Sequence, residues 1–311
     1  MVFSVFRKAQ EQGTRAGVAL GTQSFALAVV RRIAGAKPVL AECALHPIAG
    51  EGAASVRAAI ERAGAARLRA CAVLESDEYQ LVQIEAPEVL PSELRAAIRW
   101  RLRDAISFNI DEAAIDVFEI PDPARKAAQK MLFAVAARDT AIQRVATALK
   151  DAARGFDAVD IPELCLRNLC ALLPQDQKGV AMLALHENFV QLVITRQGVL
   201  YVTRRVDIRR SLSMHSAGET EIDAAALALE LQRSLDYYES HYDQTPIGDL
   251  VIAPADERAT RLADALRNET SLRVAVLDAR EHFVVNRPGE VITEWSSLMA
   301  VGAALRDEAA A

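Results

Sequence analysis

The stretch "GVALGTQSFALAVV" (residues 17–30) decides the fold of this chain. It predicts a strand, a tight polar turn over 21–24 and a second strand, because short apolar runs bounded by turn residues are typical of buried hairpins. A second stretch, "MLALHENFVQLVI" (182–194), predicts the same strand–turn–strand unit. The first strand of each hairpin ends in Ala-Leu. Two equivalent hairpins about half a chain apart indicate an internally repeated fold.

The elements that follow each hairpin repeat in the same order. After the first hairpin, the pattern predicts strands over 37–48 and 69–76 with a helix over 53–64 between them. Strands and helices that alternate in this way are typical of mixed α/β sheets. We therefore predict an α/β protein with two lobes built on one plan. In the second half, the corresponding strands are predicted over 199–208, 249–253 and 272–278, and the helices over 221–244, 256–267 and 291–305.

A separate module interrupts the first half. Its helix, "PSELRAAIRWRLRDAISF" (91–108), opens with Pro-Ser and carries an apolar stripe at every fourth position. Strands are predicted over 79–87, 113–120 and 130–137, followed by a helix over 140–155, a short strand near 158–161 and a helix over 163–173. The predicted boundaries are 1–78 and 156–175 for the first lobe, 79–155 for the inserted module and 176–311 for the second lobe.

Composition narrows the class of protein. The 311 residues are 51% hydrophobic with a formal net charge of −6, which argues against nucleic-acid binding as the main function. No apolar run approaches the ~20 residues that span a bilayer, and the first residues lack the features of a signal peptide, so we expect a cytoplasmic protein. Apolar residues of the N-terminus, at 2–6, either contact a membrane or partner or belong to a frayed end. The four cysteines lack CxxC spacing and are expected to be buried reduced thiols: Cys43, Cys71, Cys165 and Cys170.

Three stretches resemble the PilM family of type IV pilus assembly proteins. They are "ELQRSLDYYESHY" (230–242), "LMAVGAALR" (298–306) and the longer 86–121, which is similar to the family's MSHA branch, the MshI proteins. The resemblance implies a two-lobed actin-like fold (ribonuclease-H-like, ASKHA) with an inserted SHS2-like strand–helix–strand–strand module. In this family the two hairpins bind the phosphates of ATP from opposite sides of a cleft, and each first strand ends in Asp-X-Gly.

The residues that the resemblance places at this site depart from the family pattern. The first Asp-X-Gly falls on 19–21 with alanine in place of aspartate, and the second falls on 184–186 with alanine and histidine in place of aspartate and glycine. A third signature, Ser-Gly-Gly, falls on Ala-Pro-Ala at 253–255. The degenerate nucleotide site predicted from these stretches comprises Ala19, Gly21, Thr22, Gln23, Ser24, Ala184, His186, Glu187, Asn188, Ala253, Pro254 and Ala255.

These departures predict a chain without ATPase activity, without a cofactor and without a metal site. An alanine cannot hold a hydrated Mg²⁺, and loss of the metal removes charge neutralisation that phosphoryl transfer requires. Thr22, Gln23 and Ser24 are either plain turn residues or a metal-free phosphate cradle. The alternative function is a divergent ATPase that takes a metal ligand from Glu187 or Asp207.

The resemblance also implies partners. The inserted module and first lobe are expected to receive the cytoplasmic tail of a PilN-like inner-membrane protein, linking the chain indirectly to the membrane and further to pilus platform and motor proteins. The basic, tryptophan-bearing helix is either this docking site or a solvated face, and its candidate residues are Arg95, Arg99, Trp100 and Arg103. A solvent face, or contact with anionic lipid, is expected for Arg204, Arg205, Arg209 and Arg210.

Overall fold

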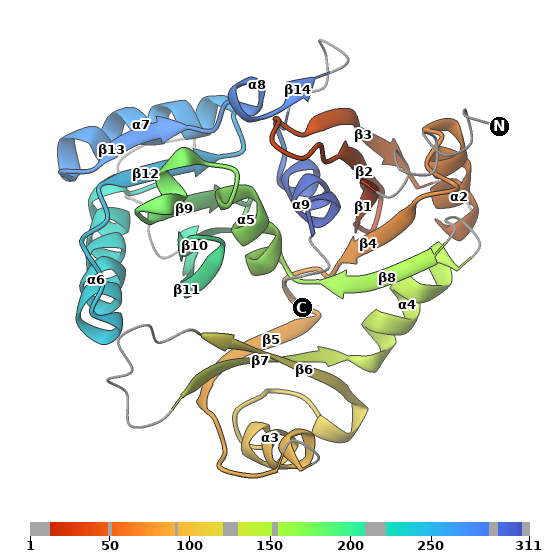
Figure 1. Ribbon diagram of the computed structural model, residues 1–311, viewed down its shortest axis with the longest axis horizontal. Helices are drawn as coiled ribbons and strands as arrows, with labels where there is room; N and C mark the ends of the chain where they lie inside the picture. The colour runs from red at the N-terminus through yellow and green to blue at the C-terminus, as the bar shows by residue number, and fades with distance from the viewer. Residues whose placement is uncertain are drawn as a thin grey trace, which may run out of the picture.

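The computed structural model describes residues 13–48, 52–90, 93–120, 130–150, 155–208, 222–285 and 292–306. The expectations for residues 2–6, Arg209 and Arg210 lie outside these ranges. Figure 1 shows two sheets side by side, each covered by helices, and a smaller three-stranded sheet beneath both. The two large sheets are the predicted lobes, and the small sheet belongs to the predicted insertion.

The first lobe is a mixed sheet with strand order β14-β3-β2-β1-β4-β8. Its first three long strands run antiparallel in sequence order, and β4 and β8 then add in parallel. Most of these strands are apolar on both faces, as expected for a sheet that is covered on both sides. The strands are β1 (Thr14–Leu20), β2 (Ser24–Arg31), β3 (Val39–Pro47), β4 (Arg69–Val73), β8 (Gly155–Asp160) and β14 (Val284–Val285), and the lobe's helices are α2 (Gly52–Arg62) and α4 (Asp139–Leu149).

The second lobe repeats this order as β11-β10-β9-β12-β13. Again three antiparallel strands are followed by two parallel ones. The predicted duplication is therefore confirmed at the level of strand order. The strands are β9 (Val180–Leu185), β10 (Phe189–Arg196), β11 (Val199–Asp207), β12 (Asp249–Ala253) and β13 (Arg273–Val276), and the helices are α6 (Ala224–Tyr242), α7 (Glu257–Glu269) and α8 (Ala279–His282).

Two helices cross between the lobes. The helix α5 (Pro162–Cys170) follows the last strand of the first lobe but packs on β9, β10 and β11 of the second. The helix α9 (Trp295–Ala304) comes from the second half of the chain but packs on β1, β2 and β4 of the first lobe, and the two helices contact each other. The predicted boundaries place 156–175 in the first lobe, 140–155 in the module and 291–305 in the second lobe, whereas α5 lies on the second sheet and α4 and α9 pack on the first lobe.

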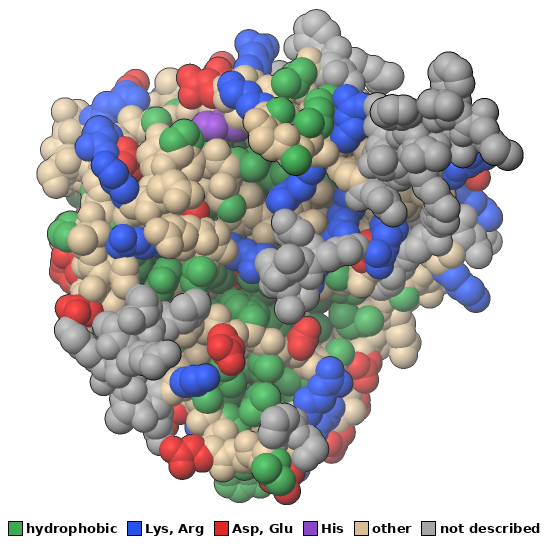
Figure 2. Space-filling view, in the orientation of Figure 1, with side chains coloured by type: hydrophobic (Ala, Val, Ile, Leu, Met, Phe, Trp, Pro, Cys, Tyr) green, Lys and Arg blue, Asp and Glu red, His purple; other side chains and the backbone are tan. Residues whose placement is uncertain are grey.

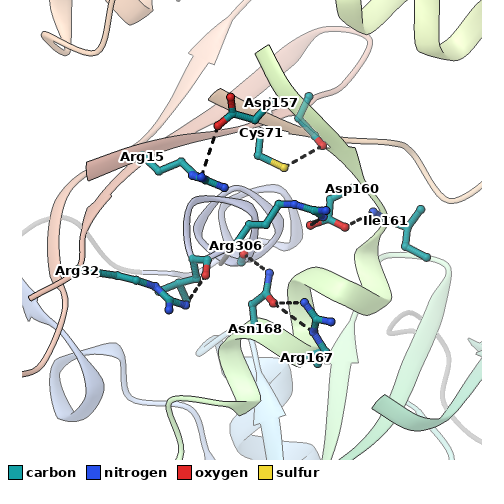
Figure 3. Close-up of polar contacts among 12 residues, drawn as sticks. Arg15, Arg32, Cys71, Asp157, Asp160, Ile161, Arg167, Asn168 and Arg306 are labelled. Atoms are coloured by element: carbon teal, nitrogen blue, oxygen red, sulfur yellow. Dashed lines mark hydrogen bonds and ion pairs between the residues drawn. The ribbon is translucent and has the colours of Figure 1, made fainter. Parts of the chain in front are cut away.

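Polar contacts fix the end of α9 between the lobes (Figure 3). Arg306 pairs with the buried carboxylate of Asp160 at 3.0 Å, and Asn168 donates to the carbonyl oxygen of Gly302 at 2.9 Å. Arg32 donates to the carbonyl oxygen of Leu305. These contacts join the ends of β2 and β8, together with α5, to the C-terminal end of α9. The end of α9 is therefore held in place by residues from both lobes.

The inserted module contains a three-stranded sheet of order β5-β7-β6 and one helix. Its helix is shorter than predicted, since residues 103–108 form turns and bends rather than a further helical segment. The strand β14 and the helix α8 were not predicted, because each is too short to show a periodic pattern. The module's elements are β5 (Tyr79–Glu85), α3 (Leu94–Leu102), β6 (Ala113–Ile120) and β7 (Met131–Arg138).

Candidate functional site

A cavity of about 860 Å³ lies between the two lobes, where the turns of the two hairpins face each other. Eight of the twelve residues predicted for the degenerate site line it: Ala19, Gly21, Thr22, Gln23, Ser24, His186, Glu187 and Asn188. The four others, Ala184, Ala253, Pro254 and Ala255, do not line it. Ala184 and Ala253 are fully buried inside neighbouring strands, so their methyl groups belong to the core of the second lobe.

The two hairpin turns have the same backbone hydrogen bond. Gly21 N–H donates to the carbonyl oxygen of Ser24 at 2.9 Å, and His186 N–H donates to that of Phe189 at 2.9 Å. Gly21 and His186 are therefore equivalent positions, and so are Ser24 and Phe189. One turn thus presents a glycine and a hydroxyl to the cavity, while the other presents an imidazole and a phenyl ring.

The His186 side chain closes over its own turn. Its Nδ1 accepts the Asn188 N–H at 3.2 Å, and its ring stacks on Phe189 with centroids 4.3 Å apart. The indole of Trp295 meets the same ring edge-on at 5.2 Å. Burial lowers the pKa of His186 below its ordinary value, and Arg205 lowers it further against the opposing effect of Glu187. The imidazole is therefore neutral at pH 7, as an acceptor at Nδ1 requires.

Arg205 completes this stack from the other side. Its guanidinium lies over the Phe189 ring, 3.8 Å from the centroid, and donates to the carbonyl oxygen of Ser76 at 3.3 Å. Ser76 lies in the loop after β4, so Arg205 reaches from the second lobe to the first. Arg205 is exposed as predicted, but the sequence carries no sign of this contact, because a strand-end arginine can take either face.

The other charged residues that line the cavity are mostly acidic. Carboxylates come from both lobes, while the second arginine of the cavity, Arg258, pairs with Asp256 at 3.0 Å. Burial, together with the neighbouring Glu78 charge, raises the pKa of Glu75. Such a lining disfavours a polyphosphate, because like charges repel most strongly where solvent screening is reduced. The acidic residues of the cavity are Glu75, Asp77, Glu187, Asp256 and Glu294.

The residues present do not fit the magnesium-bound nucleotide that the resemblance implies. No carboxylate stands at either strand end, and an imidazole accepts the N–H that a phosphate oxygen would need in the second turn. Of the two substitutes considered for a metal ligand, Glu187 lines the cavity and Asp207 does not. Within the described ranges, no cluster of three or more histidine, cysteine or acidic side chains could hold a metal ion.

The candidate partner residues lie on α3, at the end of the module away from the lobes (Figure 1). Trp100 is 72% exposed, the largest exposed fraction among the large hydrophobic side chains that the structure describes. Arg95 and Arg103 are exposed as well. Arg99 has a different role, since its guanidinium donates to the carbonyl oxygens of Ile110 and Ala113 and holds the loop that follows the helix.

Comparison with solved structures identifies the fold. The structure is similar to a protein of a PilM–PilN type IV pilus biogenesis complex, with a TM-score of 0.66 and 19% identity over 94% of this chain and 98% of that one. It also matches the cytoplasmic domain of EpsL, an inner-membrane component of the type II secretion system of Vibrio cholerae, with a TM-score of 0.49 and 11% identity over 96% of this chain and 100% of that one. A Bacteroides thetaiotaomicron protein with an actin-like ATPase fold matches with a TM-score of 0.48 and 7% identity over 88% of this chain and 94% of that one.

No protein-family model matches the chain, and no curated protein matches its sequence. The predicted two-lobed actin-like fold is confirmed, and it is a PilM-like version of that fold. In the part of the chain that the structure describes, every helix is too short or too polar to cross a membrane.

Proposed function

We propose that this chain is an actin-like scaffold of a type IV pilus machine, which acts by binding other proteins and does not hydrolyse ATP. The similarity to a PilM–PilN complex protein over 94% of the chain supports the first part. The observation that carries the second part is the His186 imidazole, which accepts the Asn188 N–H at 3.2 Å inside the second hairpin turn. The resemblance of residues 86–121 to MshI proteins makes an MSHA-type pilus our specific proposal.

Two linked features of the cleft support a degenerate nucleotide site. The strand ends carry the methyl groups of Ala19 and Ala184, which cannot hold the waters of a magnesium ion. Without that ion, the charge of a triphosphate would meet the carboxylates of Glu75, Asp77 and Glu187 at reduced screening. The second effect follows from the first, and together they favour a cleft that binds no nucleotide at cellular concentrations.

The partner that we propose is the cytoplasmic tail of a PilN-like inner-membrane protein. The neighbour's complex with PilN supports this choice. We place the docking site on the outer face of α3, because an exposed tryptophan flanked by arginines has the composition of an interface hot spot. Trp100, Arg95 and Arg103 form that face. Docking there would hold the chain at the cytoplasmic side of the inner membrane, within reach of the pilus platform and motor proteins.

Co-purification of the full chain from detergent-solubilised cells tests the scaffold function. We expect a PilN-like membrane protein, identified by mass spectrometry, to be recovered with the native chain. Trp100→Ala should reduce its recovery by about tenfold, as loss of a hot-spot side chain does. The matched control is Leu229→Ala, which truncates another exposed apolar side chain, 52% exposed, on the second lobe. Equal recovery with both variants would mean that the docking site does not lie on α3. Failure to recover any PilN-like protein with the native chain would contradict the scaffold function.

Calorimetry with Mg-ATP tests the degenerate cleft separately. We expect no binding heat at millimolar nucleotide, because neither hairpin offers both a metal ligand and free backbone N–H groups. Micromolar binding would favour the alternative function, a divergent ATPase.

A further inference from the structure

The inserted module contacts both lobes, although its chain departs from the first lobe and returns to it. Figure 1 shows its sheet lying beneath the two larger sheets, with α3 on the far side. Figure 2 shows hydrophobic side chains gathered over this region of the molecule. A module that touched one lobe alone would leave the other free to rotate about the crossing helices. The packing of the module's central strand excludes that arrangement.

One face of β7 runs under both hydrophobic cores. Alternate residues of a strand share a face, and in β7 the face opposite α3 carries Met131, Phe133, Val135 and Ala137. Met131 and Phe133 pack with the larger hydrophobic core, which contains the second lobe, α5, α9 and one face of the first sheet, and Phe133 is only 3% exposed. The neighbouring strand β6 contacts β11 of the second lobe. Val135 and Ala137 pack with the core of the first lobe. We call these four residues and their neighbour Gln83 the bridging face.

Hydrogen bonds from β5 add to the contacts of the bridging face. Gln83 donates to the Tyr242 hydroxyl at 3.1 Å and accepts from the Tyr237 hydroxyl at 3.4 Å, which joins β5 to the last turns of α6. At the other end of β5, the Tyr79 hydroxyl donates to the buried carboxylate of Glu163 at 2.6 Å. Glu163 opens α5, the helix that packs on the second lobe. The module is thus hydrogen-bonded to α5 and α6 of the second lobe by buried or half-buried groups, while Val135 and Ala137 pack on the first lobe.

We infer that the inserted module fixes the two lobes in one arrangement, so that the chain behaves as a single rigid body without interlobe rocking. The bridging face must be exposed to water before the lobes can separate, and the apolar area of Phe133 and Met131 opposes that step. This inference goes beyond the proposed function and does not depend on it. Its consequence for a scaffold is that a load applied at α3 is carried by both lobes together.

Interlobe distance measurements test the inference directly. Spin labels at Arg57→Cys on α2 and Thr260→Cys on α7 place one probe on the surface of each lobe, since both positions are exposed. The four native cysteines are buried and should not react. Pulsed electron double resonance on this labelled chain should give one narrow distance distribution. A broad or two-peaked distribution in the native background would overturn the inference.

Variants of the bridging face provide a second test of the inference. Gln83→Ala should broaden the distribution and raise deuterium uptake in the last turns of α6, and Gln83→Ala with Phe133→Ala should do so more strongly. The matched control is Gln80→Ala, which removes an equal side chain from the same strand but loses only contacts with Ser107 inside the module. Should the double variant fail to fold, the single variant decides. An interlobe distance distribution for Gln83→Ala as narrow as that for Gln80→Ala would contradict the proposal.

Discussion

Gly17 is the point where the helix from the end of the chain touches the strand from its beginning. A Cβ added at Gly17 would lie 1.9 Å from the carbonyl oxygen of Ala300 and 2.6 Å from the backbone N of Ala304. Both obstacles are backbone atoms of α9, so no side-chain rotation relieves them. Gly17→Ala therefore forces α9 away from β1 by more than 1 Å.

The loss of stability in Gly17→Ala follows from the contacts of α9 that this displacement breaks. Overpacking a tight core costs about 1–3 kcal/mol when side chains can adjust, and a backbone obstacle belongs at the upper end of that range. The displaced helix carries fully buried side chains, among them Leu298, and also the Arg306 end that pairs with Asp160. We expect a loss of about 3 kcal/mol in the free energy of unfolding. At about 2–4 °C per kcal/mol, this lowers Tm by roughly 6–12 °C.

Thermal unfolding followed by circular dichroism measures this loss. The matched control is Gly248→Ala, where the added Cβ meets only the Arg273 guanidinium, at 3.3 Å, and that exposed side chain can move. The control should change stability by less than about 0.5 kcal/mol, as ordinary surface substitutions do. If Gly17→Ala unfolds at the native temperature, α9 does not lie on β1, and the crossing of helices between the lobes is wrong.

Three further substitutions test the cleft and the buried polar groups. His186→Gly should lower the free energy of unfolding by about 1–2 kcal/mol, because ring contacts and one hydrogen bond are lost. Mg-ATP binding should stay undetectable by calorimetry, since the variant restores no carboxylate. Detectable binding would mean that the histidine alone blocks the site. Burial raises the pKa of Glu163, so the folded state binds its proton more tightly than the unfolded state and loses stability as pH rises above about 4.5. Glu163→Gln keeps an acceptor for Tyr79, so its stability relative to the native chain, from urea midpoints, should increase between pH 4.5 and 8; a constant difference contradicts this. Arg306→Leu leaves the buried Asp160 without this ion pair and should lower the free energy of unfolding by about 3–5 kcal/mol. The double variant with Asp160→Asn should recover most of this loss; no loss in the single variant would mean that the ion pair does not stabilise the fold.

The repeated hairpins were predictable from sequence because their information is local. Each needs two apolar runs, a short polar turn and nothing else, and β1–β2 and β9–β10 form where the pattern placed them. The pairing of the lobes was not predictable in the same way. Whether α9 packs beside α5 and on the first sheet depends on contacts between residues such as Asn168 and Gly302, which lie 134 positions apart. No periodic pattern encodes that choice.

Only part of the candidate site was predictable from the sequence, because only part of it is encoded locally. Positions in the hairpin turns were found because the turns align with a family signature, and they line the cavity. Glu75, Arg205 and Trp295 line the same cavity but lie at a strand end, on an edge strand and at a helix start. Their side chains meet only after the lobes assemble, so the sequence gives no spacing by which to find them.

The two alanines at the strand ends fit the proposed scaffold, because they preserve the architecture without offering a metal ligand. Ala184 is fully buried and Ala19 is 8% exposed, each within a strand ladder that runs to the edge of the cleft. A carboxylate at either position would have to lose much of its hydration, and only a bound cation offsets that cost. Once the cation is lost, alanine is the more stable residue there, because it fills the ladder without a charge. Under the proposed function, the same two alanines that leave the strand ends without a metal ligand also stabilise the hairpins, and the His186 stack covers the second turn.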